Sequence, residues 1–338
     1  MKTKCKNALR QFSFPLVTLM LIAISCSPKD KSNAPRPKAR MAKPAQTSEP
    51  RPVSAAVEGS TVDTREWHFD QTAMGPIHVI ATVPNDASDT RKMPVLIALH
   101  GQGESRKTPV MGARGWPFDY GMVQAMNRLA HPPLTTDDFG DMVTPERLQT
   151  LNRSLAERPY RGIIVVSPYL PDEFRSKRLL QDAEAYGAFI TDQLLPKVFA
   201  ETPAFTDPAH IGIDGVSLGG RASISIGLSH PKVFGAVGGT QAAFGVGQAP
   251  MIVGWLKEAR RTSPALRFRI ISSVKDKFKD FTEALSSQLD QANLSHQMDI
   301  VQGNHSYEFN RGPGVYEMLL YYDRTLRNEP FLGTDLKN

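Results

Sequence analysis

The sequence predicts an α/β fold with a mostly parallel central sheet covered by helices on both faces. Three observations support this prediction. Six apolar runs have the length and composition of buried strands, segments with helical periodicity lie between the later ones, and two segments joined by a turn precede them. Strands that alternate with helices build parallel βαβ units, and such sheets bind ligands beyond the carboxyl ends of their strands.

The expected elements follow in chain order. Residues 67–69 and 77–83 are predicted to form two antiparallel edge strands joined by a turn at residues 74–76. Buried parallel strands are predicted at residues 95–99, 162–166, 211–213, 234–238, 268–272 and 298–301. Helices are predicted at residues 180–199, 221–229, 250–260, 281–292 and 315–327.

The distribution of charge separates the start of the chain from the rest. The 338 residues carry a net charge of +6. Residues 1–60 hold eleven Lys and Arg against three acids, a net charge of +8, so the remainder carries −2. The body of the protein therefore gives no electrostatic reason to expect a nucleic acid partner.

Residues 1–25 resemble an export signal. Lys2, Lys4, Lys6 and Arg10 precede an apolar segment, residues 12–24, that is too short to span a bilayer comfortably. Cys26 follows where a bacterial lipobox would place its lipidated cysteine, although Ala23 stands in the usual Leu position. We expect an envelope lipoprotein anchored to the membrane at Cys26. The alternative is cleavage after residues 23–25, which would give a soluble periplasmic or secreted protein.

Residues 26–60 are rich in Pro, Ala, Lys and Ser and contain hardly any large apolar side chain. Such a segment cannot bury enough surface to fold, so we expect an extended, disordered tether. The catalytic domain is predicted to span residues 61–330.

The sequence Gly215-Val216-Ser217-Leu218-Gly219 lies between a predicted strand and a predicted helix. This order is typical of a nucleophile elbow, in which a sharp turn exposes the serine hydroxyl. A Cβ at either flanking glycine would collide with the neighbouring strand or helix. We therefore expect Ser217 to be a catalytic nucleophile.

A second glycine-flanked loop, His100-Gly101-Gln102-Gly103, follows the strand at residues 95–99. Backbone N–H groups of such a loop can converge on the oxyanion of a tetrahedral intermediate. We expect the oxyanion donors to be the N–H groups of Gln102 and Leu218, the latter being the residue after the nucleophile.

Three histidines follow Ser217 in the chain. His230 is expected to cap the end of a helix, and His296 opens a strand. His305 follows a glycine-containing turn at the carboxyl end of a strand, so it is the predicted general base.

Two acids compete for the third position of a Ser–acid–His triad. Asp276 lies at the end of the strand at residues 268–272, whereas Asp280 suits the first turn of the next helix. We favour Asp276, which would accept a hydrogen bond from His305 and fix its tautomer.

These motifs together resemble the α/β-hydrolase superfamily. The likeness covers roughly residues 61–327 and is greatest to the esterase-D-like branch, which includes S-formylglutathione hydrolases, feruloyl and acetylxylan esterases and mycolyltransferases. The resemblance implies the α/β-hydrolase fold and hydrolysis of carboxylic esters through an acyl-serine intermediate, without metal or organic cofactor. The expected substrate is a small-molecule or carbohydrate-linked ester.

A long insertion at residues 106–161 separates the first two parallel strands, although a minimal crossover needs far fewer residues. We interpret it as a lid or pocket wall, in which Trp116, Phe118 and Tyr120 contact substrate. The alternative is a surface elaboration with its own small core. Tyr169 is expected at the pocket rim. Glu104 either binds polar groups of the substrate or anchors the oxyanion loop.

A serine esterase explains all of these strand-end features together. An acyltransferase or serine peptidase remains an alternative, because different acceptors can attack the same acyl-enzyme. A non-catalytic envelope binding protein is a third possibility, which the complete set of Ser217, Asp276 and His305 disfavours. The oligomeric state stays open.

Overall fold

The computed structural model describes residues 59–175 and 178–332, which belong to one compact unit. The expected signal segment, the lipidation site at Cys26 and nearly all of the tether lie outside the described residues. No helix within the described part of the chain has the length and apolar character needed to cross a membrane.

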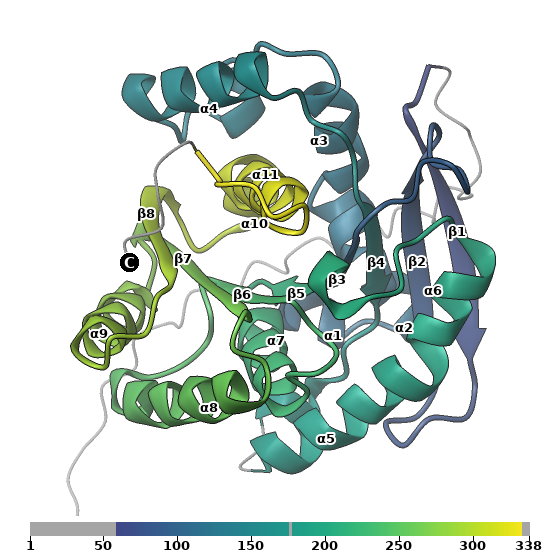
Figure 1. Cartoon of the computed structure of the whole chain (residues 1–338), viewed down its shortest axis with the longest axis vertical. Coiled ribbons are helices and arrows are strands. Elements are labelled where there is room, and N and C mark those ends of the chain that lie inside the picture. Colours follow the sequence, from purple (N-terminus) through teal and green to yellow (C-terminus); the bar gives the residue numbers. More distant parts are fainter. Residues whose placement is uncertain (1–58, 176–177, 333–338) are drawn as a thin grey trace, which may run out of the picture. The chain divides into compact units, whose positions relative to one another are not determined.

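The core of the fold is an eight-stranded sheet (Figure 1). Its strands follow the order β1-β2-β4-β3-β5-β6-β7-β8. The pairs β1–β2 and β2–β4 are antiparallel and all other pairs are parallel. The strands are β1 Val62–Phe69, β2 Ile77–Pro84, β3 Val95–Leu99, β4 Ile164–Pro168, β5 Ile211–Gly215, β6 Ala236–Thr240, β7 Arg267–Lys275 and β8 Gln297–Asn304. The predicted α/β architecture is confirmed.

Helices cover both faces of this sheet (Figure 1). One face carries α5 Leu179–Phe189, α6 Leu195–Glu201, α7 Leu218–Ser229, α8 Ala249–Thr262 and α9 Lys279–Gln291, and the other carries α3 Met122–Leu129, α4 Pro145–Glu157 and α11 Val315–Thr325. Three short helices, α1 Gln102–Ser105, α2 Pro109–Ala113 and α10 Tyr307–Phe309, lie in loops. A π-helical segment, Ile190–Leu194, joins α5 to α6.

Alternation along β3 shows how one strand serves both layers. Ile97 and Leu99 pack with the core cluster under α5, α7 and α8, whereas Leu96 and Ala98 pack with the cluster under α3, α4 and α11. Successive side chains of a strand point to opposite faces, so a strand between two helical layers must be apolar at every position. This requirement explains the continuous apolar runs of the sequence.

Helices α3 and α4 of the insertion between β3 and β4 are core elements and not a lid, whereas a pocket-wall role for the rest of residues 106–161 stays a prediction. Its helices α3 and α4 lie beside α11 and bury Met122, Met126 and Leu151 against the sheet. Arg147 of α4 donates hydrogen bonds of 2.8 and 2.6 Å to the carboxylate of Glu317 on α11. The insertion is therefore most of one layer of the fold, and its amphipathic helices are core elements.

Candidate active site

Ser217 occupies the sharp turn between β5 and α7. Its backbone has φ 57° and ψ −112°, a region that residues other than glycine rarely adopt. Two hydrogen bonds hold it there: its N–H donates to the carbonyl oxygen of Thr240 at 2.9 Å, and its own carbonyl oxygen accepts from the N–H of Ala243 at 3.0 Å. The strained turn is thus fixed by the end of β6.

The two glycines that flank Ser217 are required by close backbone contacts. A Cβ on Gly215 would lie 2.5 Å from the carbonyl carbon of Gly219. A Cβ on Gly219 would lie 2.2 Å from the carbonyl oxygen of Leu99. Neither contact is possible between real atoms, so the strand and the helix approach this closely only because both residues lack a side chain.

Ser217, His305 and Asp276 form a hydrogen-bonded chain. Nε2 of His305 lies 3.0 Å from Oγ of Ser217, and Nδ1 lies 2.8 Å from Oδ1 of Asp276. The carboxylate of Asp276 is buried, and its other oxygen accepts a hydrogen bond of 2.6 Å from Oγ of Ser272. An acceptor at Nδ1 places the ring proton there, so the lone pair of Nε2 faces the serine.

The competing residues are engaged elsewhere. His230 is the C-cap of α7, as expected, and its Nδ1 bonds to the carbonyl oxygen of Ile226. Nε2 of His296 lies 2.7 Å from Oγ of Ser286. Asp280 is an exposed residue in the first turn of α9. The geometry therefore brings together the three predicted residues and leaves out their rivals.

Gln102 and Leu218 are the first residues of α1 and α7, respectively. The first N–H groups of a helix have no intrahelical acceptor, so both amides are available to an external oxygen. The oxyanion role predicted for them stays a prediction.

His100 anchors the loop that carries Gln102. Its Nε2 accepts a hydrogen bond of 2.9 Å from the N–H of Leu170, so Nδ1 carries the proton and donates to the carbonyl oxygen of Gly101 at 3.0 Å. Burial lowers the pKa of His100 to about 4, so the ring is neutral near pH 7. The neutral imidazole ties the loop of Gln102 to Leu170, two residues after β4.

Of the three aromatic residues of the insertion that were predicted to contact substrate, Trp116 and Tyr120 are buried and Phe118 is half-buried. Trp116 has no exposed surface, and its Nε1 donates to the carbonyl oxygen of Leu99 at 2.9 Å. Tyr120 is 2% exposed and donates to the carboxylate of Glu104. The expectation of substrate contacts from Trp116 and Tyr120 is wrong, because both rings fill the core under the carboxyl end of β3.

Glu104 has the anchoring role among its two predicted alternatives. Its carboxylate is buried and accepts hydrogen bonds from the hydroxyl groups of Tyr120 and Tyr307. Tyr169 is half-buried and donates to the carbonyl oxygen of Ser105 at 2.8 Å, so its place at the pocket rim stays a prediction.

Sequence reasoning missed Gln241, which lies directly after β6. It is fully buried with φ 48°. Its Nε2 donates to Oγ of Ser273 at 2.8 Å and to the carbonyl oxygen of Asn304 at 2.9 Å. Gln241 thus links the end of β7, which precedes Asp276, to Asn304, which precedes His305. Its position at the carboxyl end of a predicted parallel strand could have indicated that it lies near the site.

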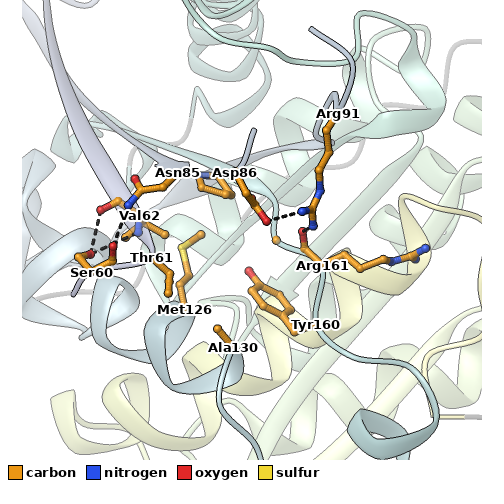
Figure 2. Close-up of a pocket in the computed structure, with 12 residues that line it drawn as sticks. Ser60, Thr61, Val62, Asn85, Asp86, Arg91, Met126, Ala130, Tyr160 and Arg161 are labelled. Carbon is orange, nitrogen blue, oxygen red and sulfur yellow. Dashed lines mark hydrogen bonds and ion pairs between the residues drawn. The ribbon is translucent and has the colours of Figure 1, made fainter. Parts of the chain in front are cut away.

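A cavity of about 320 Å³ lies at the opposite edge of the sheet (Figure 2). It is bordered by Pro84 and Asn85 at the end of β2 and by Tyr160 and Gly162 before β4. Asp86 at its rim is paired with Arg91, as Figure 2 shows. This cavity is therefore separate from the edge of the sheet that carries Ser217. Among residues 59–175 and 178–332, no three His, Cys, Asp or Glu side chains are grouped to hold a metal ion.

The family described as "Putative esterase" has a model that matches residues 71–310. The chain belongs to this esterase family. It is accordingly a carboxylic ester hydrolase, as the sequence motifs predicted. No curated protein matches it in sequence.

Solved structures of esterases share the fold of this family member. A ferulic acid esterase aligns with a TM-score of 0.58 and 16% identity, over 78% of this chain and 98% of the other. An S-formylglutathione hydrolase from Staphylococcus aureus aligns with a TM-score of 0.55 and 13% identity, over 78% and 99% of the two chains. The enterobactin esterase from Shigella flexneri aligns with a TM-score of 0.51 and 18% identity, over 76% and 58%. The α/β-hydrolase fold is confirmed.

Proposed function

We propose that this esterase cleaves its substrate through an acyl-enzyme on Ser217, with His305 as general base and Asp276 as the residue that orients it. The observation that carries the proposal is the hydrogen-bonded chain of 3.0 and 2.8 Å from Oγ of Ser217 through His305 to Asp276. A serine hydroxyl is a weak nucleophile until a neighbouring base accepts its proton, and His305 is the only imidazole hydrogen-bonded to Ser217 within the described chain.

In the first half of the reaction, Oγ of Ser217 attacks the ester carbonyl carbon while Nε2 of His305 takes the hydroxyl proton. The resulting imidazolium is stabilised by the Asp276 carboxylate. Collapse of the tetrahedral intermediate breaks the bond to the alcohol oxygen, which leaves with the proton from His305. In the second half, water repeats the same steps on the acyl-serine and releases the acid.

The negative charge of each tetrahedral intermediate falls on the former carbonyl oxygen. We infer that the N–H groups of Gln102 and Leu218 bind this oxygen, since both begin helices and lack intrahelical acceptors. The strained turn at Ser217 positions the N–H of Leu218 next to the nucleophile.

We infer that the substrate is a small-molecule or carbohydrate-linked ester, a class that includes esters of ferulic acid. Two of the similar solved structures are named ferulic acid esterases. We further propose that the protein is anchored to a bacterial envelope membrane by a lipid on Cys26. The Cys26→Ser variant should be released from membranes, whereas continued membrane association would contradict the anchor.

The experiment that tests the mechanism compares wild type with Ser217→Ala in the hydrolysis of short 4-nitrophenyl esters. The variant should lose nearly all activity, keeping only the part that oxyanion binding supplies, with unchanged circular dichroism. An unchanged rate would refute the role of Ser217.

A further inference from the structure

A cavity of about 580 Å³ is lined by residues of α5, α7 and α8, the last two of which follow β5 and β6. Its lining combines guanidinium groups with apolar side chains. The lining includes Arg175, Leu180, Arg221, Gln248, Met251 and Trp255.

Arg221 supplies a half-buried cation to this cavity. Its guanidinium donates to the carbonyl oxygens of Phe174 at 3.0 Å and Ala243 at 3.4 Å, and to Oε1 of Gln248 at 3.3 Å. The group also lies 4.8 Å from the ring centroid of Phe244. All of these partners are neutral, so none of them carries a negative charge that offsets the charge of Arg221.

The other two arginines of the cavity have carboxylate partners. Arg175 pairs with Asp172 at 3.1 Å, and Arg178 pairs with Asp182 at 3.7 Å. No carboxylate of the described chain lies within ion-pair distance of Arg221, and burial lowers its pKa. A partly buried cation without a counter-ion is costly for a protein, and an anionic ligand would remove that cost.

Two hydrogen-bond contacts join residues of this cavity to residues of the proposed catalytic site. Arg221 lies one turn after the nucleophile in α7, and its N–H donates to the carbonyl oxygen of Ser217 at 3.0 Å. On the other side, the side-chain oxygen of Gln102, when its amide is oriented toward Arg175, accepts hydrogen bonds of 2.7 and 3.1 Å from that guanidinium. Gln102 is also the proposed oxyanion donor.

Apart from the arginines and the two glutamines, Gln181 and Gln248, the lining is apolar. Met251 and Trp255 of α8 are half-buried, and Leu180 of α5 is 51% exposed. A cavity of this size that combines apolar walls with a few polar groups is typical of small-molecule sites. The combination fits a ligand with an apolar body and one negative charge.

We propose that this cavity selects esters that carry an anionic group, such as a carboxylate, and that Arg221 is the main residue that binds it. This inference rests on the proposed esterase mechanism and adds the substrate class. Arg175 assists at the rim, where its pairing with Asp172 already offsets part of its charge. A planar guanidinium can bind a carboxylate through two parallel hydrogen bonds.

The test measures kcat/KM for two matched ester pairs. One pair places the charge on the acyl side, 4-nitrophenyl hemisuccinate against 4-nitrophenyl butyrate. The other places it on the alcohol side, the acetate ester of 4-hydroxybenzoate against that of methyl 4-hydroxybenzoate. We expect wild type to prefer the charged member of one pair, which identifies the side of the ester that enters the cavity. Arg221→Gln should reduce that preference roughly 10- to 100-fold.

Three further variants make the result specific. Arg221→Lys should keep part of the preference, and Arg175→Gln should reduce it by a smaller factor than Arg221→Gln. Arg153→Gln, an exposed residue of α4 on the other sheet face, should leave the preference at the wild-type value. If Arg221→Gln does not fold, the preference is measured in Arg221→Lys and Arg175→Gln.

The proposal is overturned if wild type shows no preference within either pair, or if folded Arg221 and Arg175 variants keep the wild-type preference. That outcome is distinct from failure of the mechanism. Neutral esters would still be hydrolysed in a Ser217-dependent way, whereas failure of the mechanism would leave Ser217→Ala active on every ester.

Discussion

The hydroxyl of Tyr307 lies 2.5 Å from Oε1 of Glu104, and this contact joins the two loops that flank the nucleophile. Tyr307 follows His305 by two residues, and Glu104 follows Gln102 by two residues. Burial and the neighbouring carboxylate raise the pKa of Tyr307, so it remains a protonated donor at all physiological pH values. The contact holds the proposed base and the proposed oxyanion donor in a fixed relationship.

Tyr307→Phe should therefore lower kcat by about 10-fold while KM changes little, because the loop of His305 loses a hydrogen bond to a carboxylate. Steady-state kinetics on 4-nitrophenyl butyrate measure the effect. Tyr160→Phe removes the same hydroxyl at the opposite edge of the sheet and should leave kcat unchanged. Equal kcat values for all three proteins would show that the contact does not position His305.

The close approach of α7 to the end of β3 predicts a strong effect of one methyl group on activity. Gly219→Ala should lower kcat/KM at least roughly 100-fold, because its Cβ would lie 2.2 Å from the carbonyl oxygen of Leu99 and must displace Ser217. Gly254→Ala in α8 is the matched control, since no atom lies within 4 Å of the added carbon. It should keep full activity and raise the free energy of unfolding by about 0.5–1 kcal/mol. A fully active Gly219→Ala protein would contradict the geometry of the turn.

Replacement of Asp276 or Asp280 by asparagine shows which of the two acids near the end of β7 orients His305. Asp276→Asn should lower kcat by about four orders of magnitude, because an amide does not stabilise the imidazolium and disturbs the tautomer of His305. Asp280→Asn, in the exposed first turn of α9, should leave kcat unchanged. Rates on the same ester decide between them, and the reverse pattern would assign the acid to Asp280.

The buried His100 predicts a pH dependence of stability. Its folded-state pKa of about 4 lies below the unfolded value of about 6.5, so the unfolded chain binds the proton first as pH falls. The effect of His100 on the free energy of unfolding is absent above pH 6.5. It lowers that free energy by about 3 kcal/mol once the pH reaches the folded-state pKa. Urea unfolding of wild type and His100→Gln at several pH values measures it. The free energy of unfolding of His100→Gln should fall less steeply between pH 6.5 and pH 4 than that of wild type. An identical pH dependence in both proteins would assign it to other groups.

The sequence was sufficient for the features that depend on local order along the chain. Ser217, Asp276 and His305 each lie one or two residues after the end of a strand, and parallel strands bring their carboxyl ends to one edge of the sheet. The strained turn at Ser217 was also predictable, because the flanking glycines report a close backbone approach. These inferences need only the order of strands, turns and helices.

The features that depend on contacts between distant segments were not predictable. Trp116 and Tyr120 belong to an insertion whose aromatic residues suit a lid and a buried layer equally well, and only the packing of α3 and α4 decides between them. The hydrogen-bond partners of Gln241, Tyr307 and Arg221 were not predictable for the same reason. The direction of each side chain, and hence its partner, is set by segments far away in the sequence.

The covalent step at Ser217 is tested most directly by peptide mapping after reaction with a fluorophosphonate probe. The protein without residues 1–25 is incubated with the probe, digested and analysed by mass spectrometry. A single adduct on the peptide that contains Ser217 is expected, with labelling slowed in His305→Gln and absent in Ser217→Ala. An adduct on another residue, or undiminished labelling of Ser217→Ala, would contradict an acyl-enzyme at this serine.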